Sequence, residues 1–193
     1  MKSIVGLILG LFSGLMVWSQ DRQVVEQDFV WYRYRNVLKL DSNWSISTEI
    51  ENRRFVPTHR SHQLLPGRVI LHHKLGKGWE AAVGFVYFLQ CLPQEANEEI
   101  AVIRPEIRPH QELVHRTKSG PWQIRQRLRI EERFFRNTLD NELVKGYRFN
   151  WRFRYRIRAD YRLWEKQSRY LSMSAFDEVM VNAGRSIGQN FFD

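Results

Sequence analysis

The chain has 193 residues, enough for one domain, and its formal net charge is +9. Its single cysteine, Cys91, excludes an internal disulfide. In a cytosolic protein the basic charge would suggest nucleic acid, but the leader described next predicts export, so we expect anionic lipid headgroups or small anions instead and no nucleic-acid partner.

The beginning of the chain has the pattern of a secretory signal peptide. Lys2 supplies the positive start, and an apolar run over residues 4–18 follows it. The run is shorter than the ~20 residues that a membrane helix needs, and no basic stop follows it. Ser19 has the small side chain that precedes a cleavage point. We therefore predict a signal peptide over 1–19 and one mature domain over 20–193.

Strand patterns dominate the mature chain. We expect eight strands near residues 29–40, 44–55, 68–76, 79–90, 106–118, 122–135, 146–163 and 169–182. Turn-forming residues separate several of them, at Asp41-Ser42-Asn43, Gly76-Lys77-Gly78 and Ser119-Gly120-Pro121. Longer connections are expected at 56–67, 91–105 and 136–145. Successive strands joined by short turns predict an all-β, antiparallel up-and-down meander.

The segment Tyr147 to Tyr161 alternates between arginines and aromatic or apolar residues. Because successive strand side chains point to opposite faces, one face is aromatic and the other carries the arginines. The alternation exceeds the ~5–6 residues of an ordinary strand and the ~9–11 that cross a bilayer. Residues 122–134 repeat the pattern, with Gln126 and Glu132 as polar exceptions on the apolar face.

A soluble barrel or sandwich would turn the aromatic face inward, whereas a membrane barrel turns it outward. An interior of about eight strands is only just wide enough for packed side chains, so aromatic rings from every strand would overfill it. Closure also removes exposed sheet edges. We therefore predict a transmembrane β-barrel of the outer membrane with about eight strands present and the charged face inside.

The inward face supplies the candidate site, a polar network of arginines and glutamates. Its predicted members are Arg33, Arg35, Glu49, Glu51, Arg53, Arg125, Arg127, Arg129, Glu131, Arg152, Arg154, Arg156 and Glu178. One interpretation is a structural interior in which the charges pair; the other is an anion-selective channel. The sixth and seventh predicted strands carry too few acidic residues to balance the charge of their arginines. Either neighbouring strands must supply carboxylates, including Glu49, Glu51 and Glu178, or anions must enter the interior.

No enzyme, cofactor or metal pattern is apparent. His59 and His62 share a predicted loop but lack a third ligand at suitable spacing. His72 and His73 are adjacent, so on a strand they point to opposite faces. A lipid-modifying hydrolase is the enzymatic alternative, but Ser172 and its neighbours have no matching histidine in the sequence. We expect a structural or binding protein without catalytic residues.

Several stretches resemble a family of outer-membrane barrels known as domain of unknown function 2490. The most specific are Arg-Gln-Arg-Leu-Arg-Ile-Glu-Glu-Arg-Phe at 125–134 and Asp-Glu-Val-Met-Val-Asn at 177–182; others lie at 31–34, 44–49, 53–55 and 108–112. They cover most of the mature chain in the expected order. The resemblance implies a barrel fold and an outer-membrane location, and it implies no activity.

The end of the sequence departs from that family. The chain finishes at Asp193, shortly after the eighth predicted strand, where family members continue with further strand. We therefore expect either a fragment that lacks its closing strand or an atypical closing strand.

Overall fold

The computed structural model describes residues 27–56, 58–93, 98–166, 169–184 and 187. The predicted signal peptide and the last six residues lie outside this part of the chain. The described residues form eight strands: β1 (Phe29–Lys39), β2 (Trp44–Phe55), β3 (Ser61–Gly76), β4 (Trp79–Leu92), β5 (Val102–Ser119), β6 (Trp122–Leu139), β7 (Glu142–Lys166) and β8 (Arg169–Ala183). No helix in the described ranges is long and apolar enough to cross a membrane.

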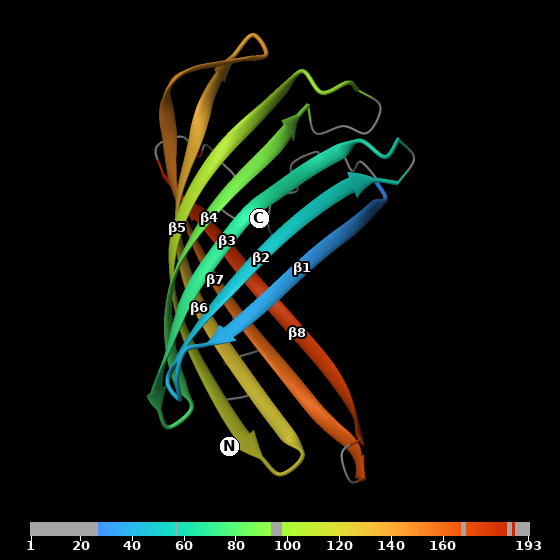
Figure 1. Ribbon diagram of the computed structural model, residues 1–193, viewed down its shortest axis with the longest axis vertical. Coiled ribbons are helices and arrows are strands. Elements are labelled where there is room, and N and C mark those ends of the chain that lie inside the picture. Colours follow the sequence, from blue (N-terminus) through green and yellow to red (C-terminus); the bar gives the residue numbers. More distant parts are fainter. Residues whose placement is uncertain (1–26, 57, 94–97, 167–168, 185–186, 188–193) are drawn as a thin grey trace, which may run out of the picture.

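The strands form one antiparallel sheet in chain order, each paired with its neighbours in sequence. The sheet curls into a half-barrel, with β6, β7 and β8 behind the strands that begin the chain (Figure 1). Within the described residues β1 and β8 form no ladder, so the sheet stays open between them. The predicted all-β meander of eight antiparallel strands is therefore confirmed.

Three predicted connections are wrong in length. β3 begins at Ser61 rather than near residue 68, and the loop between β4 and β5 is restricted to residues 93–101. Between β6 and β7 the expected loop at 136–145 is a tight turn of Asp140 and Asn141, both with positive φ (48° and 63°). Two consecutive positive φ values match the twist of the flanking strands and suit Asn and Asp, so the hairpin needs no longer loop.

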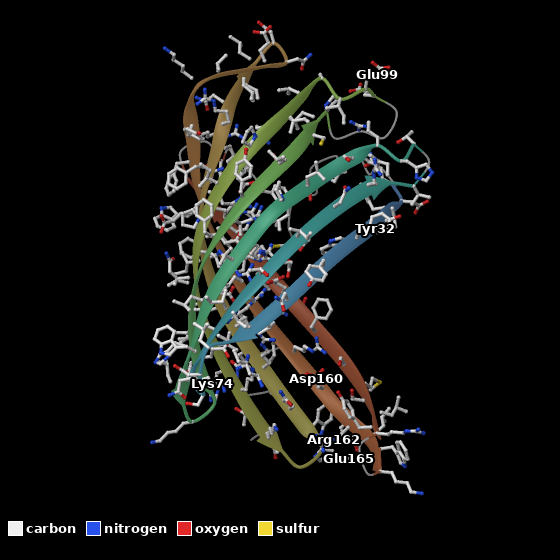
Figure 2. The ribbon with its side chains drawn as sticks, in the orientation of Figure 1. Tyr32, Lys74, Glu99, Asp160, Arg162 and Glu165 are labelled. Carbon is white, nitrogen blue, oxygen red and sulfur yellow. The ribbon has the colours of Figure 1, made fainter. Side chains whose placement is uncertain are left out.

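The two rims of the half-barrel differ. We call the rim with the turns at 40–43, 77–78 and 120–121 the turn end, and the rim with the connections at 56–60, 93–101 and 140–141 the loop end. Lys74 and Asp160 lie toward the turn end and Glu99 toward the loop end (Figure 2). At the turn end the backbone N–H groups of Trp44 and Asn43 donate to the Asp41 carboxylate, which lowers its pKa.

Large apolar side chains lie on the convex face and charged ones on the concave face. The convex side chains include Tyr34, Val83, Phe85, Phe153, Tyr155 and Val179, all exposed. Glu106, Glu131 and Arg129 are buried on the concave face. Gln126 and Glu132, the polar residues on the otherwise apolar face of β6, are hydrogen-bonded on the convex side. Tyr155 donates to Gln126 at 2.7 Å, and Gln111 donates to Glu132 at 3.3 Å. The alternation in the sequence therefore assigns the faces correctly.

A small apolar cluster fills part of the interior. Leu65, Val86 and Phe88 pack together there, and Phe55 is fully buried. Next to them, Gly84 faces the buried ring of His110, and a Cβ atom at this position would collide with that ring. The glycine is therefore required by the close approach of a side chain on the neighbouring strand β5.

Candidate functional site: the charged interior

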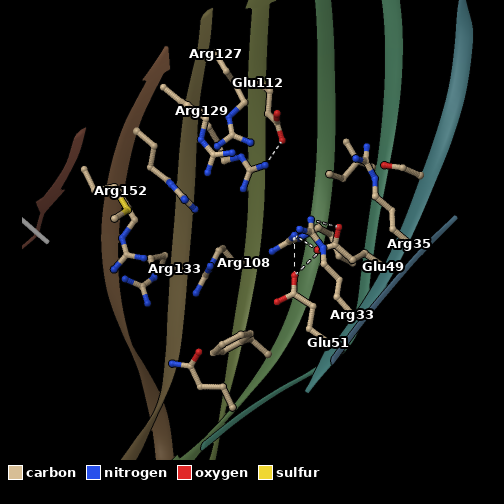
Figure 3. A pocket seen from close by; sticks show the side chains of 18 of the residues that line it. Arg33, Arg35, Glu49, Glu51, Arg108, Glu112, Arg127, Arg129, Arg133 and Arg152 are labelled. Carbon is tan, nitrogen blue, oxygen red and sulfur yellow. Dashed lines mark hydrogen bonds and ion pairs between the residues drawn. The ribbon is translucent and has the colours of Figure 1, made fainter. Parts of the chain in front are cut away.

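A cavity of about 650 Å³ occupies the concave side of the sheet. Eleven of the thirteen predicted network residues line it, and the other two, Glu131 and Glu178, bond to arginines that do. Figure 3 shows Arg127, Arg129 and Glu112 on one wall and Arg33, Glu49 and Glu51 on the facing wall. The structure therefore brings the whole predicted set together around one space.

The first wall, from β1 to β3, is organised by two glutamates. Glu49 accepts a 2.6 Å hydrogen bond from Arg33 and a second from Arg68. Glu51 lies 3.6 Å from both of these guanidinium groups and accepts from the Trp31 indole at 3.0 Å. Glu49 and Glu51, two of the acids that could balance the arginines of the sixth and seventh strands, are instead engaged by Arg33 and Arg68 on their own wall.

A second cluster lies deeper, on β5 and β6. Glu106 is fully buried, with Arg108 at 2.8 Å and Arg133 at 2.7 Å from the same oxygen, and Arg133 also donates to its other oxygen at 3.1 Å. Charge-assisted contacts of this kind are about twice as strong as neutral ones. This cluster was not predicted from the sequence, although the alternation of Glu106, Arg108, His110 and Glu112 along one strand face was the available signal.

On β6, β7 and β8 a single carboxylate serves three arginines. Glu178 lies 2.7 Å from Arg127 and 2.8 Å from both Arg154 and Arg156. Glu131 adds contacts with Arg129 at 3.3 Å and Arg154 at 3.1 Å. These bridges offset an unfavourable register, because β6 and β7 place arginines directly opposite each other at 125/158, 127/156 and 129/154.

Positive charge remains in excess at the turn end. Of the described residues that line the cavity, thirteen are arginines and three are glutamates. Arg125 stands between Arg116 and Arg158 on its two neighbouring strands, and each of these has a carboxylate of its own, Glu80 and Asp160. Among the described residues, neither Arg125 nor Arg35 has a carboxylate within 4.0 Å.

A chain of hydrogen bonds crosses the three strands β2, β3 and β4 on the concave face. Ser47 Oγ on β2 lies 2.9 Å from His72 Nε2 on β3, and His72 Nδ1 lies 3.1 Å from Glu80 Oε1 on β4. This group could not be predicted from the sequence, because its members are 25 and 8 residues apart and meet only through strand pairing.

The histidines do not gather. His72 faces the interior while His73 stacks on Trp44 outside, with ring centroids 4.0 Å apart. His115 stacks likewise on Trp79 at 4.3 Å, whereas His110 is buried. Within the described ranges, no three His, Cys, Asp or Glu side chains are grouped as a metal site would require.

These features define a class of protein: a β-meander of barrel type, apolar outside and lined with ionic groups inside. The chain belongs to the family described as "Protein of unknown function (DUF2490)", whose match spans residues 29–193. The family part of the resemblance is thereby confirmed. Neither the curated proteins nor the solved structures contain a match to this chain.

Proposed function

We propose that this chain is an exported β-barrel protein of the outer membrane whose convex face contacts lipid. The observation that carries the proposal is the reversal of the usual burial pattern. Exposed rings and aliphatic side chains cover the outside of the strands, including Phe85 at 49% and Tyr155 at 44% exposure, while Glu106 and Glu131 are almost fully buried. Lipid would cover that apolar face and leave the buried ionic groups of the interior in place.

Location is tested by fractionation of cells that express the full chain. The protein should sediment with outer membranes, resist carbonate extraction and lose its first residues up to Ser19. Recovery of folded protein in the soluble periplasmic fraction without detergent would refute the proposal and favour a soluble barrel or sandwich.

The assignment of the convex face to lipid is tested by a pair of neighbouring substitutions in β7. Phe153→Asp places a charge on the proposed lipid face, where Arg or Lys costs up to ~2–4 kcal/mol at the bilayer midplane and Asp costs less. Arg154→Gln removes an interior charge instead, and its partners Glu131 and Glu178 keep other arginines. Membrane assembly should fall for Phe153→Asp and stay near normal for Arg154→Gln. The opposite ranking would contradict the assignment.

For the interior we propose a structural and binding role, based on the carboxylates that each bridge several arginines. A second candidate, an anion-selective channel, is favoured by Arg125 and Arg35, which line the cavity and have no ion-pair partner in the described part of the chain. The two are separated by conductance of the purified full chain in planar bilayers. A structural interior gives no steady current. A channel gives a chloride-selective current that falls when Arg127 and Arg154 are replaced by glutamine.

A further inference from the structure

Ser47, His72 and Glu80 have the order of contacts found in nucleophilic hydrolases: a hydroxyl, a base and a carboxylate that orients the base. All three side chains lie on the concave face, on adjacent strands. Both contacts, 2.9 Å from Ser47 Oγ to His72 Nε2 and 3.1 Å from His72 Nδ1 to Glu80 Oε1, are within the range that proton transfer requires.

The partners of Glu80 determine the direction of the hydrogen bonds. Its second oxygen accepts from Arg116 at 2.8 Å, so the carboxylate is held ionised and fixed in position. An ionised carboxylate accepts only, and therefore His72 Nδ1 donates to it. In the neutral ring this leaves the lone pair of His72 Nε2 directed at the Ser47 hydroxyl, the tautomer that a general base needs.

Ser47 faces a cavity that is lined both by an apolar residue and by arginines. Ser47 is only 3% exposed, but it lines the 650 Å³ cavity together with His72, and Glu80 is on the next strand, β4. Ile70, the residue opposite Ser47 on β3, also lines the cavity and offers an apolar contact. Arg125 and Arg35, which have no carboxylate within 4.0 Å among the described residues, line the same cavity as Ser47 and His72.

We propose that the interior hydrolyses carboxylic esters of anionic molecules, with Ser47 as nucleophile, His72 as general acid–base and Glu80 as positioning residue. Arg125 and Arg35 bind the anionic group of the substrate. Ser47 Oγ bonds to the ester carbonyl carbon while its proton passes to His72 Nε2. The ester C–O bond breaks, and the alcohol leaves with that proton. Water then attacks the acyl-serine, releases the acid and restores the Ser47 hydroxyl through His72.

The proposal goes beyond the proposed membrane function and does not depend on it, because every group involved faces the interior. It replaces our expectation of a protein without catalytic residues by a specific alternative. The purified full chain is tested in whichever state it folds, in detergent if it is a membrane protein and in buffer if it is not. Heat-modifiable migration or circular dichroism verifies folding first, so failure of the two proposals can be told apart.

The first experiment is covalent labelling with diisopropyl fluorophosphate, a small reagent that reacts with activated serines. Mass spectrometry should find the adduct on Ser47, and labelling should disappear in Ser47→Ala. His72→Gln should slow labelling by about 10²–10⁴-fold, the usual contribution of a general base. Ser45→Ala is the matched control, because Ser45 is opposite His72 on β2 and shares the face of Ser47. It should label at the normal rate.

Several results of the labelling experiment would overturn the proposal. A folded protein that takes no label, or that takes it on a serine other than Ser47, overturns the proposal. So does a His72→Gln variant that labels as fast as the unsubstituted chain, since the serine would then not be activated by this histidine.

The second experiment compares a neutral ester, 4-nitrophenyl butyrate, with an anionic one, mono(4-nitrophenyl) succinate. Arg125→Gln should raise KM for the anionic ester about tenfold and leave the neutral ester unchanged. Arg136→Gln, a charge removal farther along the same strand, should affect neither. Glu80→Gln should lower kcat for both esters without raising KM, as expected for a residue that only positions His72. Hydrolysis that survives in Ser47→Ala, or equal effects of Arg125→Gln on both esters, would overturn these roles.

Discussion

Glu106 and Arg125 face the same interior from adjacent strands, yet their surroundings are opposite. Glu106, toward the loop end, is fully buried and has two arginines on its oxygens. Arg125, near the turn end, is only partly buried and lies between two further arginines. Burial of a charge is tolerated where pairing is complete, and pairing is left incomplete where water or a ligand can reach. The comparison suggests that the deep cluster stabilises the fold and that the turn end recognises anions.

The largest effect is expected from breaking the deep cluster. Glu106→Gln leaves Arg108 and Arg133 without their shared carboxylate in a buried site, and removing one partner of a buried ion pair costs about 3–5 kcal/mol. Urea denaturation of the folded chain measures the free energy of unfolding. Glu132→Gln on the outer face is the control and should change it little. Equal effects of the two variants would show that Glu106 is not a stabilising centre.

A smaller loss is expected from Glu178→Gln at the wall formed by β6, β7 and β8. Three arginines lose a shared acceptor, but Glu178 has a side-chain exposure of 10% and water can replace part of its contacts. We expect a loss of about 1–3 kcal/mol, the usual cost of leaving partly buried polar groups unsatisfied. The same denaturation measurement checks this. A loss greater than that of Glu106→Gln would reverse the order of the two clusters.

A third substitution tests packing rather than charge. Gly84→Ala brings a Cβ atom into the ring of His110, and overpacking of this kind costs about 1–3 kcal/mol. Gly67→Ala is the matched control, because nothing lies within 4 Å of a Cβ atom built there. The melting temperature should fall for the first variant only. In a His110→Ala background, Gly84→Ala should become nearly neutral; if it does not, His110 is not the cause.

The smallest effect on stability is expected at the turn end, with the opposite sign. Arg125→Gln removes a like charge that lies directly opposite Arg116 and Arg158, and such pairs are destabilising within a range of about 0.2–1 kcal/mol. The variant should be as stable as the unsubstituted chain or slightly more so, at low ionic strength. Measurable destabilisation would mean that Arg125 is a structural residue and would remove the contrast between the two ends.

The sequence by itself determined the fold class and the two faces. Alternation along Tyr147 to Tyr161 places arginines and rings on opposite sides whatever the neighbouring strands are, because the period of a strand is two. Turn residues such as Gly76 and Gly78 marked the strand order, since only consecutive strands can be joined so tightly. Most residues of the charged interior could be predicted from the alternation along the strands and from the turn residues between them.

Only the tertiary structure decided which charges meet. Glu178 lies opposite Arg156 and reaches Arg127 two strands away, and Ser47, His72 and Glu80 come from three different strands. These contacts depend on register and on the curl of the sheet, which moves side chains on distant strands toward one another. Hydrophobic alternation fixes which face a residue occupies, but it does not fix its height relative to the next strand. The cavity and the serine–histidine–glutamate group could therefore be recognised only after folding.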